Sequence, residues 1–182
     1  MELRNRMLAS YFFLVHFCPK VCLLYPVRTK VSTPMKAEET IDFHIKTGWY
    51  AISRMYNTYS AQFDMTMAIG YVLLHIHKDG TPATKIAPAL GLEARSLTRM
   101  LKTLEEKKWI ERSANYEDKR VVKIFLTEIG KKKRDQARKG VIAFNKLIYD
   151  RVPPEKLQVF FEVMSSVNQV LEVDAGEILK TI

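Results

Sequence analysis

Cysteine is nearly absent from this chain of 182 residues, and its two cysteines, Cys18 and Cys22, both lie within the first 34 residues. Residues 35–182 can therefore form no disulfide framework, no thiolate metal cage and no cysteine redox switch. This distribution suits a reducing compartment, so we expect a cytoplasmic protein. It also argues against the sensing of oxidants through a thiol.

Long uninterrupted apolar runs are missing as well. The most apolar segment, residues 11–27, is broken by two prolines, a histidine and a lysine. A membrane-spanning helix needs about 20 nearly uninterrupted apolar residues, so we expect no membrane partner. Arg4 and Arg6 precede this segment as in a secretion signal, but no clear small-x-small cleavage site follows.

The first 34 residues leave three interpretations open. The favoured one is a dispensable extension, either disordered or upstream of a true start at Met35, because a polar helix opening begins at Lys36. The alternatives are a real accessory arm and a targeting segment. The intact mass of the natively expressed protein separates them, since a product that begins at Met1 contradicts a start at Met35.

Catalytic motifs are lacking too. The sequence has no P-loop, no Gly-rich dinucleotide turn, no nucleophile elbow and no convincing Ser/His/Asp set. Most carboxylates stand near Lys or Arg in the sequence, which is typical of a solvated surface. We therefore expect neither an enzyme nor a cofactor.

Positive charge is concentrated in the middle of the chain. Of the net charge of +9, residues 82–140 supply +8, from 16 Lys and Arg against 8 Asp and Glu. A localised basic patch is the electrostatic signature of a polyanion partner. The alternative is a basic face that is merely solvated.

Helical spacing of apolar residues predicts the first half of the body. We expect the second helix to stop at Gly80, and Thr84 to cap a short third helix with Pro88 in its first turn. The four expected helices span residues 41–63, 66–78, 85–90 and 93–107.

Two β-type runs follow, Trp109–Ser113 and Arg120–Leu126, and they predict a hairpin. Thr127 is expected to cap a long helix, and Pro153-Pro154 separates it from a last apolar helix. The predicted fold is mainly α with a small β-hairpin wing. It forms one domain over residues 35–182.

We expect the long helices over residues 38–63 and 128–180 to join two copies into a homodimer, because they are too apolar to cover only a small motif. The alternative is that they close the core of one monomer. Residues 84–130 lie between them and hold the order of a winged helix-turn-helix, a helix followed by a hairpin. We expect this segment to be the DNA-binding lobe, with double-stranded DNA as the partner.

The fourth helix is amphipathic in a way that suits DNA binding. At 100° per residue, its leucines and Met100 share one face, and its basic and hydroxyl residues share the other. Because Arg can bond two guanine acceptors, we expect Arg95 and Arg99 near base edges. Ser96, Thr98 and Lys102 are expected nearer the DNA backbone. An ordinary amphipathic surface helix is the alternative.

The expected hairpin places Lys119 and Arg120 at its tip, where a guanidinium could enter the narrow, negative minor groove. Asp118 is poorly suited to touch phosphate itself. It could instead orient Arg120 or Arg112 through a charge-assisted hydrogen bond.

The sequence resembles the MarR family of bacterial transcription regulators. The residues that carry the resemblance are Leu97-Thr98-Arg99-Met100-Leu101 with Leu104, then Trp109-Ile110-Glu111-Arg112, and Asp118-Lys119-Arg120 followed by Leu126-Thr127-Glu128-Ile129-Gly130, the pattern D-x-R…L-T-x-x-G. The resemblance covers about residues 40–175. It implies a homodimer joined by its terminal helices, with the fourth helix in the major groove and Arg120 in the minor groove. It also implies a repressor released from a pseudo-palindromic operator by a small aromatic or phenolic effector.

Two positions depart from the family pattern. Lys108 stands where the turn after the recognition helix usually carries Gly. If the backbone is left-handed at this position, lysine is strained there and glycine would not be. Glu93 replaces the usual Ser or Thr cap, so we expect that helix end to be frayed or set by the charge of Glu93.

The effector site is the least determined part of the sequence. Trp49, Met55, Tyr56 and Tyr71 are candidates for a ligand pocket, although packing in the core explains them equally well. We expect no metal site, because His75 and His77 on one helix would point about 200° apart. A regulated operator is the leading function, and an architectural or protein-interaction module built on the same winged helix is the alternative.

Overall fold

The computed structural model describes residues 36–114, 122–174, 176 and 179–180 of the chain. The chain divides at Phe43 into two units, residues 1–43 and 44–182, and each is described by itself. The described part of the first unit holds the short 3-10 helix η1 (Ala37–Glu39) and the start of helix α2 (Ile41–Ala61). Here the hydroxyl of Thr40 accepts a hydrogen bond from the Phe43 amide at 3.3 Å and so caps α2.

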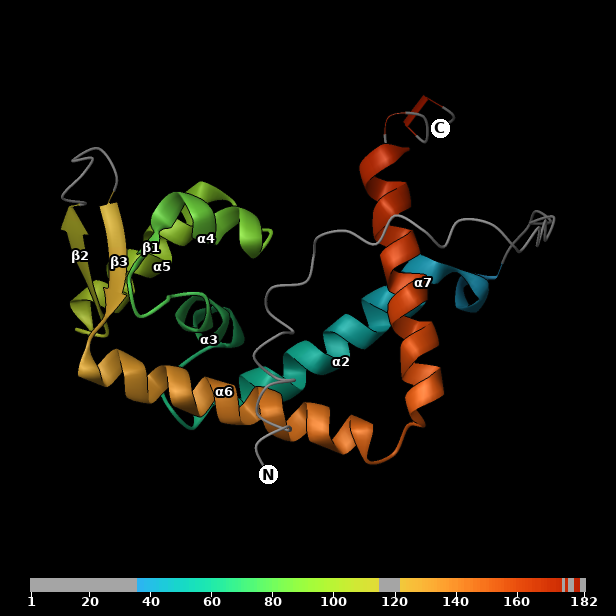
Figure 1. The fold of residues 1–182 in the computed structure, drawn as a ribbon, viewed down its shortest axis with the longest axis horizontal. Helices are drawn as coiled ribbons and strands as arrows, with labels where there is room; N and C mark the ends of the chain where they lie inside the picture. Colours follow the sequence, from blue (N-terminus) through green and yellow to red (C-terminus); the bar gives the residue numbers. More distant parts are fainter. Residues whose placement is uncertain (1–35, 115–121, 175, 177–178, 181–182) are drawn as a thin grey trace. The chain divides into compact units, whose positions relative to one another are not determined.

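The second unit is mainly helical with one small sheet (Figure 1). Its sheet is three-stranded and antiparallel, in the order β1-β3-β2, with Ile124 paired to both Thr81 and Arg112. After α2 its elements are α3 (Met67–Leu74), β1 (Thr81–Pro82), α4 (Ala83–Ala89), α5 (Ala94–Glu106), β2 (Ile110–Ala114), β3 (Val122–Leu126), α6 (Glu128–Tyr149) and α7 (Pro154–Val173).

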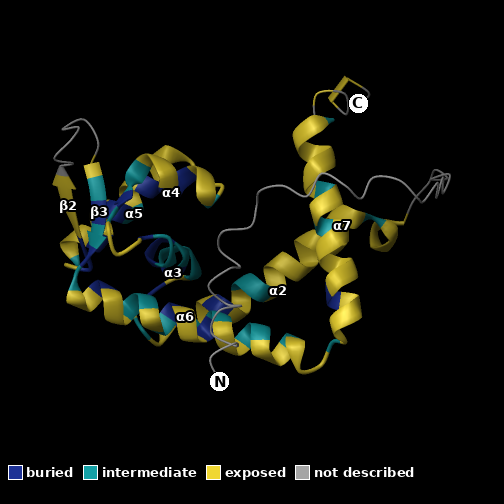
Figure 2. Ribbon diagram, viewed as in Figure 1, coloured by how far each residue is buried: buried dark blue, intermediate teal, exposed yellow. Residues whose placement is uncertain are grey.

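The predicted fold class is confirmed: long helices flank a winged helix-turn-helix core. Burial of aliphatic side chains from α3, α4, α5, β2 and β3 holds this core together, at about 25 cal/mol for each Å² removed from water. Figure 2 shows the buried stretches meeting where α3, α4, α5 and the sheet face one another. The most deeply buried side chains are Val72, Leu73, Ile76, Ile86, Leu101, Leu104 and Ile124.

The second half of α2 packs against α3 and α6. The hydroxyl of Tyr59 donates to the carbonyl oxygen of Gln136 at 2.9 Å, and its ring covers Gly140, where a Cβ would lie within 2.6 Å of the ring. Gly70 on α3 faces Ala137 on α6 in the same way, so the two helices approach closely. Small residues on α3 and α6 thus connect α2 to the winged lobe.

The structure corrects the expected end of the second helix, which stops at Leu74 and not at Lys78. The reason is Thr81, whose buried hydroxyl accepts from the His77 amide at 2.9 Å and donates to the His75 carbonyl at 3.1 Å. These bonds satisfy the backbone in a turn and lead it into β1, a strand that the sequence analysis did not predict.

The third helix also differs from the expectation. It begins at Ala83 after Pro82, and no side chain caps it, so the predicted cap at Thr84 is wrong. Pro88 lies near the end of α4 and not in its first turn. Thr127 does cap α6 as predicted, because its hydroxyl accepts from the Gly130 amide at 3.1 Å.

Candidate nucleic-acid interface

Helix α5 separates its side chains as the sequence predicts. Leu97, Leu101 and Leu104 are almost completely buried under the lobe, and Met100 is half-buried at the edge of the same core. The five side chains expected to meet DNA are all exposed: Arg95, Ser96, Thr98, Arg99 and Lys102. The buried leucines therefore fix the helix by its apolar face and leave its polar face to solvent.

The guanidinium groups of Arg95 and Arg99 have no hydrogen-bond or ion-pair partner within the described part of the chain, so they can turn toward an incoming acceptor. Thr98 differs, because its hydroxyl donates to the Ala94 carbonyl at 2.8 Å within the helix. Lys102 lies 4.0 Å from Glu106, a loose and fully exposed ion pair that costs little to break.

The start of α5 has Glu93 in the cap position, and its side chain makes no capping hydrogen bond. The end of α5 is held more firmly. Lys108 has a φ of +57°, and the Trp109 amide donates to the Leu104 carbonyl at 2.9 Å. This is a Schellman motif built on lysine where glycine would be free of strain.

The wing is tied to α5 by an ion pair that the sequence analysis did not foresee. Arg112 on β2 donates through Nε to Glu105 on α5 at 2.9 Å. Arg112, which was one of the two arginines expected to be oriented by Asp118, thus has a carboxylate partner on α5. Asp118, Lys119 and Arg120 lie outside the described residues.

A cluster at the base of the lobe was also missed. Lys107, the C-terminal cap of α5, pairs with Asp64 at 2.6 Å, and Lys133 on α6 donates to the Phe63 carbonyl at 2.6 Å. Both ammonium groups lie near the ring of Trp109, whose centroid is 5.0 Å from Lys107 Nζ and 4.9 Å from Lys133 Nζ. The hydrogen bond from Lys107 holds the pKa of the Asp64 carboxyl below its usual range.

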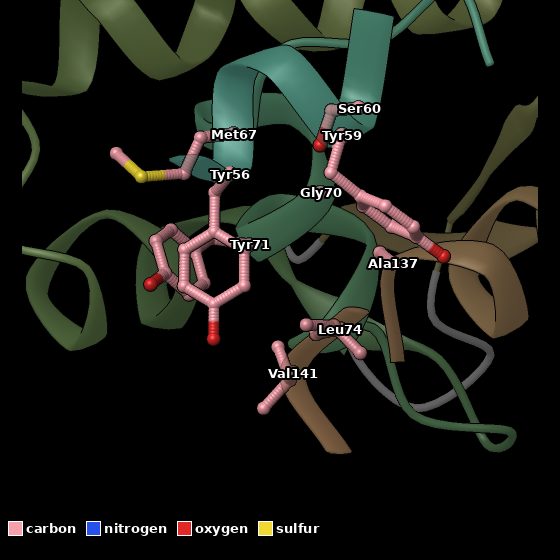
Figure 3. Close-up of a pocket in the computed structure, with 9 residues that line it drawn as sticks. All are labelled: Tyr56, Tyr59, Ser60, Met67, Gly70, Tyr71, Leu74, Ala137 and Val141. Atoms are coloured by element: carbon pink, nitrogen blue, oxygen red, sulfur yellow. The ribbon is translucent and has the colours of Figure 1, made fainter. Parts of the chain in front are cut away.

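A shallow indentation, open to solvent and with enclosed room for about one water molecule, lies where α2, α3 and α6 meet (Figure 3). Two of the four predicted pocket residues, Tyr56 and Tyr71, line it. Trp49 and Met55 do not belong to its lining, and both are exposed. The other lining residues are Tyr59, Ser60, Met67, Gly70, Leu74, Ala137 and Val141.

Tyr56 and Tyr71 at this indentation are neutral phenols. Burial, with a smaller contribution from the nearby Tyr71, raises the pKa of Tyr56 to about 12, and burial also raises the pKa of Tyr71. The two rings meet edge to face, with centroids 6.2 Å apart. The hydroxyl of Tyr59 is already bonded to Gln136, whereas those of Tyr56 and Tyr71 have no partner among the residues described.

The expected argument about the histidines rested on both lying in one helix, and this premise is wrong. His75 is the C-terminal cap of α3, and its Nδ1 lies 2.9 Å from the Tyr71 carbonyl. His77 lies beyond the helix. Across the described ranges, no three His, Cys, Asp or Glu side chains are grouped closely enough to hold a metal ion. None of the helices described is long and apolar enough to cross a membrane.

Known proteins resemble this chain in sequence and in fold. The sequence model of the MarR family matches residues 72–122. The uncharacterized HTH-type transcriptional regulator YfiV of Bacillus subtilis is 31% identical over 113 residues, which are 61% of this chain and 70% of that protein.

Solved structures agree with this relationship. A mutant MarR from Escherichia coli complexed with operator DNA superimposes with a TM-score of 0.61 at 25% identity, over 68% of this chain and 90% of that chain. CouR from Rhodococcus jostii bound to p-coumaroyl-CoA superimposes with a TM-score of 0.64 at 19% identity, over 73% and 94% of the two chains. The exposed polar face of α5, the wing that follows it and these relatives have one explanation: the chain belongs to the MarR family of DNA-binding, winged helix-turn-helix transcriptional regulators.

Proposed function

We propose that this protein is a repressor that binds a pseudo-palindromic operator as a homodimer and leaves it when a small aromatic or phenolic ligand binds. The observation that carries the proposal is the division of α5 into a buried leucine face and an exposed face, whose two guanidinium groups have no partner among the described residues. A helix anchored in this way can enter the major groove without exposing the core.

In this arrangement Arg95 and Arg99 read base edges, because a guanidinium matches the paired acceptors of guanine. Ser96 and Lys102 hold phosphate. Thr98 would have to release the Ala94 carbonyl before it could donate to phosphate, so we assign it a van der Waals or accepting role. On the wing, we assign the next minor groove to Lys119 and Arg120 and the orientation of Arg120 to Asp118; these three residues lie outside the described part of the chain.

Unpartnered apolar surface on the terminal helices supports a homodimer. Trp49 on α2 is 50% exposed and Phe160 on α7 is 55% exposed, and α7 buries only Leu157 in this chain. A second copy would remove such side chains from water, and a twofold dimer places two recognition helices in successive major grooves, roughly 34 Å apart. That geometry requires an operator with two inverted half-sites.

The indentation between α2, α3 and α6 is the candidate effector site. Aromatic rings suit a planar ligand, and the neutral hydroxyls of Tyr56 and Tyr71 can donate to a ligand oxygen. CouR, which has the same fold, was solved with p-coumaroyl-CoA bound, and this supports a phenolic ligand class. A ligand that wedges between α3 and α6 would act on the contact between Gly70 and Ala137.

Fluorescence anisotropy tests the proposal with the DNA upstream of the protein's own gene and a scrambled duplex, at two salt concentrations. We expect tight binding to the upstream DNA that persists at physiological salt. The same comparison is repeated with sites selected from a random library. Equal, salt-sensitive binding to specific and scrambled duplexes in both comparisons would contradict a regulated operator. It would favour the architectural module.

The division of labour on α5 is tested by two matched substitutions. Arg99→Ala is expected to cost about 1–3 kcal/mol and to relax the choice of one base pair in each half-site, whereas Lys102→Ala weakens binding to all sequences alike. Binding to a panel of single-base operator variants measures both effects. Indistinguishable profiles for the two variants would refute the assignment of base contact to Arg99.

A further inference from the structure

Helices α2 and α5 end in the same unusual way, and their ends lie next to each other. Asp64 follows α2 with a φ of +57°, as Lys108 follows α5, and the Met65 amide donates to the Ser60 carbonyl at 3.2 Å. Both ends are therefore Schellman motifs on residues that carry a side chain, in a conformation that favours glycine. Glycine would avoid this strain at both positions, but at Asp64 the side chain makes a contact that glycine could not make.

This contact is with Lys107, the residue before Lys108, and it joins the two helix ends. Lys107 Nζ lies 2.6 Å from a carboxylate oxygen of Asp64 and 3.5 Å from its carbonyl oxygen. Residues 64 and 107 are 43 positions apart, so this bond connects α2 directly to the end of the recognition helix. The carbonyl groups that end α2 are negative, which adds to the attraction for lysine.

Helix α6 joins the same cluster through Lys133, which donates to Phe63 at 2.6 Å. Trp109 is only 5% exposed, and each of the two ammonium groups lies close enough to its ring for a cation–π interaction. We name the five residues Phe63, Asp64, Lys107, Trp109 and Lys133 the α2–α5–α6 joint.

We propose that the α2–α5–α6 joint fixes the angle of the recognition helix relative to the dimerisation helices and thereby sets the half-site spacing that the dimer accepts. The inference rests on the proposed function. The joint links the two regions whose relative angle is in question. Helices α2 and α6 lead to the proposed dimer interface, and Lys107 directly follows α5. Asp64 and Lys107 are positioning residues in this scheme.

The substitution that tests this is Asp64→Asn. Asparagine keeps the shape of the side chain and tolerates the left-handed backbone, but it loses the charge that holds Lys107. Removing a negative charge near a basic lobe would by itself tighten DNA binding on every duplex. General electrostatics would change the affinity for every duplex alike. The proposal predicts instead a smaller loss of affinity on altered spacings, so the two effects can be told apart.

Asp150→Asn is the matched control. Asp150 pairs with Lys146 at the same 2.6 Å, but the two are four residues apart at the end of α6, so that ion pair links no separate elements. The double variant Asp64→Asn/Lys107→Met completes a cycle, because the second substitution should add little once the first has broken the bond.

The experiment uses the full-length chain and a duplex selected by that chain from a random library. The duplex is also made with one base pair inserted or deleted at its centre, which moves the half-sites by roughly 3.4 Å. We expect the parent and Asp150→Asn proteins to lose at least tenfold in affinity on the altered spacings, and Asp64→Asn to lose less than threefold. An Asp64→Asn protein with the spacing penalty of the parent refutes the joint alone.

A measurement without DNA separates the joint from the proposed function. Residues 35–182 contain no cysteine, so a nitroxide on Thr103→Cys in a Cys18→Ser/Cys22→Ser background reports the distance between the two α5 helices of a dimer. We expect Asp64→Asn to widen this distance distribution at least twofold. An unchanged width overturns the joint, whereas a parent protein that shows no paired spins, or no preference among duplexes, overturns the proposed function and the joint with it.

Discussion

Gly130→Ala should destabilise the fold strongly, although alanine normally favours a helix. Gly130 lies in the first turn of α6. A Cβ at this position would collide with the carbonyl oxygen of Trp109, and it would lie 2.9 Å from the carbonyl carbon of the same residue and 3.2 Å from Leu126 Cδ2. The nearest two are backbone atoms, so no change of rotamer relieves the contact.

The Trp109 carbonyl cannot easily move away. It accepts a hydrogen bond from the Thr127 amide at 3.1 Å and a longer, shared one from the Thr127 hydroxyl at 3.2 Å, since that hydroxyl also donates to the Lys108 carbonyl at 2.7 Å. These bonds attach the start of α6 to the end of α5. The carbonyl group would have to shift to restore ordinary van der Waals contact, and the shift would weaken both of its bonds. The clash and the bonds therefore act against each other at a single carbonyl group.

The expected magnitude follows from these terms. Overpacking costs about 1–3 kcal/mol and each weakened hydrogen bond about 0.5–1.5 kcal/mol, while the helix propensity of alanine returns about 1 kcal/mol. The net loss in the free energy of unfolding is about 2–4 kcal/mol. For a domain of this size that corresponds to a Tm lowered by roughly 5–15 °C.

Gly48→Ala is the control for this experiment. Gly48 also lies in a helix, α2, but a Cβ there meets no atom within 4 Å. We expect this variant to gain about 0.5–1 kcal/mol. Thermal unfolding followed by circular dichroism at one protein concentration compares the two, and a Gly130→Ala protein that melts at or above the parent temperature would refute the reasoning from Trp109.

Two further stability measurements test single residues. Lys108→Gly should raise the free energy of unfolding by about 1 kcal/mol in urea, because glycine adopts the φ of +57° without strain, and an unchanged or lower midpoint would contradict this. Tyr56→Phe should flatten the pH dependence of stability above pH 10. Burial raises the pKa of Tyr56 from 10.0 to about 12, so the unfolded chain loses the phenol proton first, and the contribution present below pH 10 is lost as the pH rises toward 12. Equal slopes for Tyr56→Phe and the parent in that range would show that another group titrates.

The parts of the fold that could be predicted are those with a local period. Leu97, Leu101 and Leu104 recur at helical spacing, and this pattern alone separates the buried face of α5 from its exposed face. The strand β1, by contrast, has two residues and therefore no period. It exists because Thr81 satisfies the backbone of a turn and pairs with Ile124, two contacts that depend on the tertiary structure.

The site followed the same division. The polar residues of α5 were found from their spacing, but the Asp64–Lys107 and Arg112–Glu105 pairs join separate elements, and no local pattern connects them. Of the four residues predicted for a ligand pocket, only Tyr56 and Tyr71 line the indentation, and the reason is similar. Tyr56 lies on the face of α2 that meets α3 and α6, whereas Trp49 lies in a part of the same helix that is exposed in this chain.

The charge of the lobe has a different meaning once the contacts are known. Lys107, Arg112 and Lys133 contribute to the basic total of residues 82–140, yet each is bonded to a carboxylate or carbonyl group within the protein. These cations hold α5, the wing strand β2 and α6 in place. Arg95 and Arg99 on α5 are exposed and have no partner among the described residues. In the proposed function the basic residues of the lobe therefore act in two ways, some holding the lobe together and others meeting DNA, and the net charge overstates the number of phosphate contacts.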